Sequence, residues 1–174
     1  MLIVADSSAL IALATCGGLN VILQVYDDIR VPEAVYAEIV APEKPQSDAL
    51  GLFLAGRVAK VDTTRWVLTA GGLGRGEIEA MALYKQLTAD ALLIDDHRAR
   101  IIAEHNQINC IGVLGLLLIA KQEGKIAEIA PYIQKLRQSS IYYGDALLDR
   151  VLKLQGNEIF LSEPDTLLFR RLGA

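Results

Sequence analysis

The sequence has few of the residues that mark several common classes of protein. Among its 174 residues are only two cysteines, Cys16 and Cys110, which stand far apart and lack the spacing of a metal-binding pair. A disulfide framework and a thiolate zinc site are therefore not expected, whereas two buried thiols in a reducing compartment are. Aromatic residues make up 6% of the chain and hydrophobic residues 52%, so the core should consist mainly of Leu, Ile, Val and Ala.

Long apolar runs and an excess of basic residues are also missing. The longest apolar stretch, residues 111–120, is too short to cross a bilayer, and the opening MLIVADSSALIALA has no basic lead and carries Asp6 within its apolar run. We therefore expect a soluble, unprocessed, cytoplasmic protein with no membrane partner. The formal net charge of −4 excludes a general nucleic-acid coat with a broad Lys/Arg surface. Any polynucleotide must be bound locally, where a metal ion reverses the sign of the field.

Signatures of two large enzyme classes are absent. Residues 71–77, GGLGRGE, are glycine-rich, but neither GxxxxGK[ST] nor a strand-borne GxGxxG accompanies them, so they are only a weak indication of a phosphate-binding loop. No order of Ser, His and acidic residues suggests acyl transfer.

The sequence does contain a regular alternation of short apolar segments and helical patterns. Strands are expected at residues 2–5, 29–31, 58–61, 91–94 and 109–112, and helices at 8–16, 33–40, 47–56, 77–86, 97–105, 115–124, 128–138 and 145–156. This alternation predicts a three-layer α/β/α fold with a central parallel sheet. No repeat or linker precedes Gly156, so residues 1–155 are expected to form one domain, followed by a tail, residues 156–174, that packs on this domain or on a partner.

Acidic residues follow two of the expected strands. Asp6 follows LIVA, and Asp95 and Asp96 follow ALLI, at the strand ends where open parallel sheets bind ligands. The glycine-rich loop brings a further acid, Glu77, to the start of a helix. Taken singly, Asp6 or Asp96 is also a preferred helix N-cap, and that alternative stays open for each. Their repetition at one edge favours a binding site.

Several carboxylates gathered at one edge require a cation. Three carboxylates about 5 Å apart repel by roughly 3 kcal/mol per pair at an effective dielectric constant of about 20. Oxygen ligands select a hard ion, Mg²⁺ or Mn²⁺, and the two histidines, His97 and His105, do not make a zinc site. His97 and Arg98 are candidates for contacting substrate phosphate, although exposed helix positions are the commoner setting for such residues.

Together these segments resemble the PIN-domain superfamily, and within it an uncharacterised branch similar to the ribonuclease toxins of toxin–antitoxin pairs. The segments that carry the resemblance are LIVADSSALIALA, VPEAVYAEIV, GLGRGEIEAMALYKQL, ALLIDDHRAR and IGVLGLLLIAKQEGKI, within residues 2–126, with a looser continuation in YYGDALLDRVLKLQGN. The resemblance implies a metal-dependent endoribonuclease that hydrolyses phosphodiester bonds with one or two ions of Mg²⁺ or Mn²⁺.

The resemblance also implies roles for individual residues. The positions expected to be catalytic are Asp6, Glu38, Glu77 and Asp96. The expected metal ligands are Asp6, Glu77, Asp95 and Asp96. The candidates for substrate binding are Ser8, His97 and Arg98, and Ser8 also matches a position that supports the first acid. Many relatives have Asp where this chain has Glu77, which leaves the number of ions open.

RNA is the expected substrate, and the expected partners are a small antitoxin protein and a second copy of the chain. Two other classes stay open at this stage. One is a non-catalytic α/β module that binds nucleic acid or protein and uses its acids as caps and solvated edges. The other is a phosphohydrolase that acts on small phosphate esters.

Overall fold

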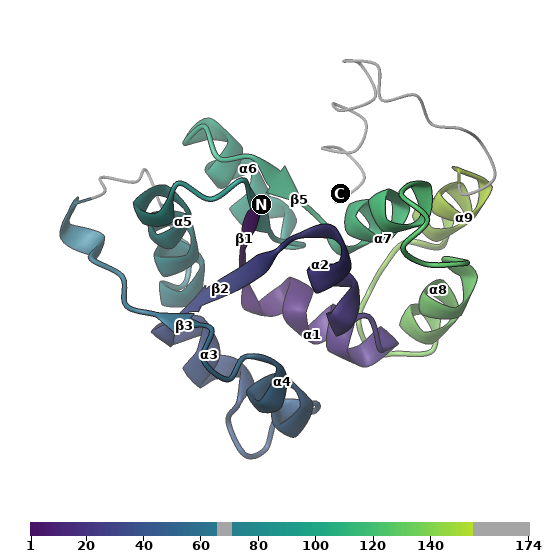
Figure 1. Ribbon diagram of the computed structural model, residues 1–174, viewed down its shortest axis with the longest axis horizontal. Helices are drawn as coiled ribbons and strands as arrows, with labels where there is room; N and C mark the ends of the chain where they lie inside the picture. The colour runs from purple at the N-terminus through teal and green to yellow at the C-terminus, as the bar shows by residue number, and fades with distance from the viewer. Residues whose placement is uncertain (66–70, 155–174) are drawn as a thin grey trace.

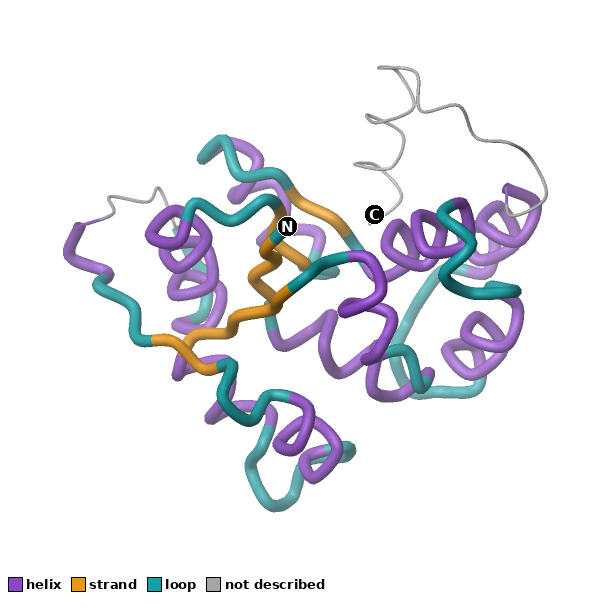
Figure 2. Tube along the Cα trace, in the orientation of Figure 1, coloured by secondary structure: helices purple, strands orange, loops and turns teal. Residues whose placement is uncertain are grey.

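The computed structural model describes residues 1–65 and 71–154, so the expected tail, residues 156–174, lies outside the described residues. Five parallel strands form a sheet in the order β3-β2-β1-β4-β5 (Figures 1 and 2). The strands are β1 (Leu2–Ala5), β2 (Asp28–Pro32), β3 (Val58–Ala59), β4 (Ala91–Leu93) and β5 (Cys110–Ile111). The first strand of the chain is therefore the central strand of the sheet.

Nine α-helices surround this sheet in the described part of the chain. They are α1 (Ser7–Cys16), α2 (Leu19–Val25), α3 (Glu33–Ile39), α4 (Ser47–Phe53), α5 (Arg75–Leu87), α6 (His97–His105), α7 (Val113–Gln122), α8 (Ala130–Arg137) and α9 (Asp145–Leu154), and a short 3₁₀ helix covers Thr63–Arg65. Every expected strand and helix is present, while α2 and the 3₁₀ helix were not expected. The predicted α/β fold with a parallel sheet is confirmed.

Strand residues alternate between two apolar clusters, one on each face of the sheet. Ile3 and Leu93 belong to the larger cluster, which includes side chains of α1, α2, α7 and α8. Val4 and Leu92 belong to the smaller cluster, which is completed by α5 and α6. Because both faces are covered, β1, β4 and β5 are apolar at every position, whereas β2 also has Asp28 and Arg30, which pair with each other. The result is a three-layer α/β/α arrangement.

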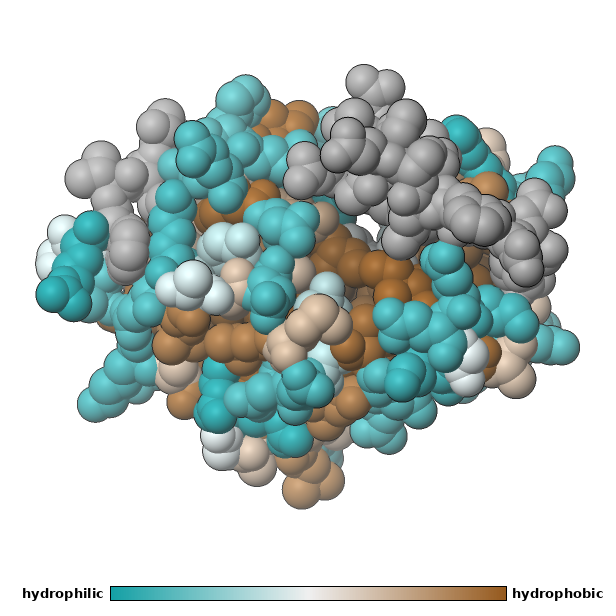
Figure 3. All heavy atoms as spheres, turned by 45° about the horizontal axis from the view of Figure 1, so that its top comes forward, coloured by the Kyte–Doolittle hydropathy of each residue, from teal (hydrophilic) through white to brown (hydrophobic). Residues whose placement is uncertain are grey.

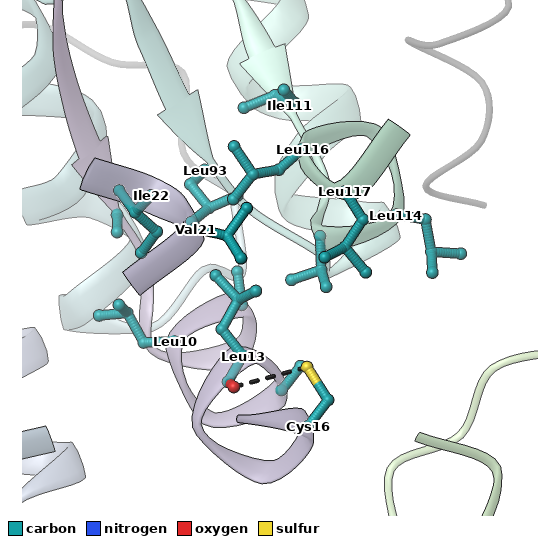
Figure 4. Close-up of a cluster of buried hydrophobic side chains, with 14 of the residues drawn as sticks. Leu10, Leu13, Cys16, Val21, Ile22, Leu93, Ile111, Leu114, Leu116 and Leu117 are labelled. Carbon is teal, nitrogen blue, oxygen red and sulfur yellow. Dashed lines mark hydrogen bonds between the residues drawn. The ribbon is translucent and has the colours of Figure 1, made fainter. Parts of the chain in front are cut away.

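Aliphatic side chains from several helices fill the larger cluster. Figure 4 shows Leu13 of α1, Val21 of α2 and Leu116 of α7 gathered beside Leu93 of β4 and Ile111 of β5. The Cys16 thiol at the end of α1 donates a hydrogen bond to the Leu13 carbonyl at 3.5 Å. Burial raises the pKa of Cys16 to about 11, so this thiol stays protonated and packs as a small apolar group.

No single helix in the two described ranges is long and apolar enough to span a membrane. Helices α1 and α2 together have sufficient length and apolar composition, but the chain bends by 108° between them and both contribute to the core. On the face shown in Figure 3, hydrophilic side chains surround apolar ones near the centre. Large apolar side chains reach solvent at a few positions, such as Leu52 and Tyr142, which are 81% and 91% exposed.

The order of the strands creates a switch point between β1 and β4. From β1 the chain proceeds outward to β2 and β3, and then returns to the opposite side of β1 to form β4 and β5. The helices that follow the two central strands, α1 and α6, pack on opposite faces of the sheet. A crevice is expected beyond the carboxyl ends of such a strand pair. The Asp6 N–H donates to the Leu93 carbonyl at 2.9 Å, so the acids after both strands meet there.

Candidate functional site

A cavity of about 720 Å³ opens at this switch point. Its walls come from the loop after β1 and the start of α1, from α3, from the start of α5, and from the residue before α6. The lining residues are Asp6, Ser7, Ser8, Ile11, Ala34, Ala37, Glu38, Gly74, Arg75, Gly76, Glu77 and Asp96. The structure thus brings together the four acids that the sequence singled out as catalytic.

Asp6 is the most deeply buried of these acids, at 2% exposure. Its Oδ2 atom accepts hydrogen bonds from the Ser8 N–H at 3.2 Å and the Ser8 hydroxyl at 2.8 Å, and thereby caps α1. Its Oδ1 atom is buried and has no hydrogen-bond partner among the described residues. Burial raises the pKa of Asp6, the bonds from Ser8 oppose this, and the charge of Glu38 adds to it. A cation would satisfy the unpaired oxygen and relieve the cost of burying the charge.

Glu38 reaches the cavity from α3. Its Oε2 atom accepts a hydrogen bond from the Ser7 hydroxyl at 2.9 Å, which fixes the carboxylate relative to the start of α1. The same oxygen would lie 3.4 Å from a Cβ built on Gly76, so the absence of a side chain there lets α3 and α5 approach closely. Ser7 was not singled out from the sequence, because next to Asp6 it reads simply as a helix-start residue.

Glu77 lies in the first turn of α5 and reaches back to the residue before the helix. Its Oε2 atom accepts a hydrogen bond from the Gly74 N–H at 2.7 Å. Burial is the main cause that raises the pKa of Glu77; the bond from Gly74 lowers it, and the charges of Asp6, Asp96 and Glu38 raise it. These mutual effects indicate that the four carboxylates share one electrostatic environment.

Asp96 is exposed and caps α6, with its Oδ1 atom accepting a hydrogen bond from the Ala99 N–H at 2.7 Å. Both Asp6 and Asp96 are therefore helix N-caps, which was the alternative to a binding site that the sequence left open. A cap uses only one of the two carboxylate oxygens, however, and both residues also line the cavity. Capping and ligand binding are compatible at each position.

Asp95 points elsewhere. Its Oδ1 atom accepts a hydrogen bond from the Val113 N–H at 2.9 Å at the start of α7, and its Oδ2 atom accepts one from the Tyr143 hydroxyl. Asp95 does not line the cavity. We leave it out of the proposed ligand set, because both of its oxygens are already used to tie helices to the sheet. Its backbone N–H donates to the Ser8 hydroxyl at 3.4 Å, so it lies just behind the site.

Two candidates for substrate contact lie outside the cavity lining. His97 is exposed at the start of α6. The Arg98 guanidinium donates through Nη2 to the Gly71 carbonyl at 3.2 Å and lies against Gly72. Ser8, the third candidate, does line the cavity, where it supports Asp6. The cavity has instead a cation that the sequence did not single out, Arg75, whose position inside GLGRGE was the available signal.

The donor set fits a hard divalent ion. Within residues 1–65 and 71–154, no three acidic, His or Cys side chains already converge on one point where a single ion would contact them all. The side chains that line the cavity nevertheless offer only carboxylate and hydroxyl oxygens as ligands, which Mg²⁺ and Mn²⁺ prefer. The unpaired oxygen of Asp6 is the clearest sign of a missing positive charge.

A three-layer fold with four carboxylates at the switch point of a parallel sheet defines a class of α/β domains whose ligand site has oxygen donors suited to a divalent cation. Comparison with protein families agrees, since a family model described as a PIN domain matches residues 2–157. The chain belongs to this PIN-domain family, whose members are generally metal-dependent nucleases. Comparisons with curated proteins and with solved structures found no significant match.

Proposed function

We propose that this protein is an endoribonuclease that depends on Mg²⁺ or Mn²⁺. The observation that carries the proposal is the buried, unpaired Oδ1 atom of Asp6 in a cavity shared with three other carboxylates. A protein that used its acids only as caps and solvated edges would have no reason to bury an unsatisfied oxygen among like charges.

In this mechanism Asp6, Glu77 and Asp96 would hold the ion, and Glu38 would contact it directly or through water. When bound, the ion supplies positive charge that offsets the negative charge building on the scissile phosphate, and it lowers the pKa of a bound water. The serine hydroxyls have orienting roles, because Ser8 fixes Asp6 and Ser7 fixes Glu38. The carboxylates are thus positioned before substrate arrives, and no covalent enzyme intermediate is required.

RNA cleavage by the purified protein tests the proposal. Cleavage should require Mg²⁺ or Mn²⁺, cease in excess EDTA, return when metal is restored, and be abolished by Asp6→Asn. Calcium should support binding more than turnover. Full activity in EDTA would rule out the metal mechanism. Hydrolysis of small chromogenic phosphate esters without RNA cleavage would identify a phosphohydrolase, and absence of any hydrolysis would favour a binding module.

We further propose that the protein is the toxin of a toxin–antitoxin pair and that it self-associates. The acidic cavity supports an inhibitor that inserts a basic side chain among the carboxylates. The exposed apolar side chains Leu52 and Tyr142 are candidates for such contacts. A small protein encoded beside this chain should copurify with it and inhibit cleavage, and light scattering should show a dimer. A monomer that no neighbouring gene product inhibits would contradict both proposals.

A further inference from the structure

Arg75 is a cation at the edge of an acidic cavity. Among the described side chains that line the cavity, it alone carries a positive charge, and every other ionisable one is a carboxylate. Its side chain is 82% exposed, so neither core packing nor burial explains its position. The residues on either side, Gly74 and Gly76, lie close to the carboxylates, since a Cβ at these positions would be 3.5 Å from Glu77 Oε2 and 3.4 Å from Glu38 Oε2.

The position is electrostatically unfavourable for the helix itself. Arg75 is the first residue of α5, the end where the helix dipole favours anions and disfavours cations. An exposed arginine gains little stability from that helix end itself, and its ion pair with Glu79 offsets the unfavourable dipole. A negatively charged ligand that approaches this helix end would find both the arginine and the dipole favourable.

A buried acid holds the guanidinium in place. The Arg75 Nε atom donates to Glu79 Oε1 at 2.7 Å, and Glu79 is only 8% exposed. The other Glu79 oxygen accepts a hydrogen bond from the Ala34 N–H at 3.2 Å, which anchors the acid to the start of α3. This contact occupies Nε, and within residues 1–65 and 71–154 no group accepts a hydrogen bond from the two terminal nitrogens of Arg75, which are thus available to a ligand. The paired terminal donors match the oxygens of a phosphate.

We propose that Arg75 binds an RNA phosphate next to the cleaved bond and that Glu79 is the positioning residue that orients it. This inference rests on the proposed ribonuclease function. With the carboxylates neutralised by metal, the positive charge of Arg75 determines where the neighbouring phosphate lies. Arg98 is not equivalent, because it lies outside the cavity lining and already donates to the Gly71 carbonyl.

The test measures binding of a single-stranded RNA oligonucleotide, one that the wild-type protein cleaves, in calcium and over a range of salt concentrations. Arg75→Gln should weaken binding about tenfold, as expected for loss of roughly 1.4 kcal/mol. It should also lower the slope of log Kd against log salt by about 0.7, the contribution of one phosphate on a single strand. Arg75→Lys should keep the salt dependence of log Kd but bind RNA more weakly. Lysine keeps the positive charge but lacks the paired N–H donors of the guanidinium.

Arg150→Gln is the matched control, since Arg150 is an exposed arginine on α9, at the opposite side of the molecule from α5 in Figure 1. It should behave as wild type. In Arg75→Gln the rise in Tm caused by Mn²⁺ should be retained. This readout separates loss of phosphate binding from damage to the metal site.

Equal slopes and affinities for Arg75→Gln and Arg150→Gln, with an active wild type, would overturn the role of Arg75 and leave the proposed function intact. Loss of the Mn²⁺ effect on Tm in Arg75→Gln would also overturn it, because the residue would then serve the metal site. A wild-type protein that neither binds nor cleaves RNA would remove the proposed function and this inference together.

Discussion

The two carboxylate oxygens of Asp6 have different roles, one in the stability of α1 and the other in the proposed metal site. Oδ2 caps α1, whereas Oδ1 is buried without a partner in the described part of the chain. Asn is as good an N-cap as Asp, so a substitution can keep the first role and remove the charge. The loss of stability caused by burying the Asp6 charge can therefore be measured separately from the contribution of Asp6 to capping α1.

Asp6→Asn should make the metal-free protein more stable and the metal-loaded protein less responsive. Because burial raises the pKa of Asp6, the ionised form costs free energy that the amide does not. A gain of about 1 kcal/mol would raise Tm by about 2–4 °C for a chain of this size. Thermal melts in EDTA and in a Mn²⁺ series measure both effects. Asp48→Asn, at an exposed first-turn position of α4, is the control and should change neither.

Glu77 and Glu79 are two residues apart on α5 and have different tasks. Glu77 lines the cavity, whereas Glu79 accepts hydrogen bonds from Arg75 and from the Ala34 N–H. Glu77→Gln should reduce metal affinity and cleavage rate by orders of magnitude without unfolding the protein. Glu79→Gln should leave turnover within a few-fold of wild type and lower the free energy of unfolding by about 1 kcal/mol.

Single-turnover RNA cleavage across a Mn²⁺ titration, together with urea denaturation of both variants, measures these differences. An inactive Glu79→Gln beside an active Glu77→Gln would show that the ligand has been assigned to the wrong acid.

At the scale of single residues, the sequence predicted which acids lie at the same edge of the sheet, but not which hydrogen bonds each carboxylate accepts. Strand ends and the glycine-rich loop located Asp6, Asp96 and Glu77. Adjacent acids after one strand, Asp95 and Asp96, could not be separated, because their directions depend on contacts with α7 and Tyr143 that are remote in sequence.

At the scale of elements, a part-buried hydrogen bond ties the loop before α9 to the sheet. The Tyr143 hydroxyl donates to Asp95, whose other oxygen accepts the Val113 N–H at the start of α7. Burial, followed by the charge of Asp95, raises the pKa of Tyr143, so the phenol keeps the proton that it donates. The contact links α7, α9 and the end of β4.

Tyr143→Phe should lower the free energy of unfolding by about 1–3 kcal/mol, because it leaves one oxygen of a partly buried carboxylate without its donor. Urea denaturation measures this change. The neighbouring Tyr142 is 91% exposed, so Tyr142→Phe is a matched control and should be neutral. Equal stability of the two variants would show that the hydroxyl contributes nothing to the packing of these helices.

The elements themselves were largely predictable from periodicity and from capping residues. The exception among the helices was α2, whose seven residues, LNVILQV, are too short and too apolar to show a helical period. Its position became evident only from packing, since Val21 and Ile22 complete the cluster between α1 and α7. Short buried segments of this kind depend on tertiary contacts more than on local preference.

At the scale of the whole molecule, the labelling rates of the two cysteines measure how often each of the two apolar clusters opens. Cys16 lies in the larger cluster and Cys110 in the smaller, on opposite faces of the sheet, at 0% and 5% exposure. If residues 1–155 unfold as one cooperative domain, both thiols should react with a labelling reagent at the same opening-limited rate. Cys16→Ala and Cys110→Ala, each retaining one thiol, assign the rates. A Cys110 that reacts much faster would show that the layer of α5 and α6 opens alone.

The central place of β1 also determines when this protein acquires its chemistry. Asp6 is synthesised some 90 residues before Asp96, which follows its sheet neighbour β4. Until that strand pairs, the nascent chain has half a sheet and an incomplete set of carboxylates. The proposed ribonuclease therefore has no complete site until β4 and Asp96 have joined the sheet.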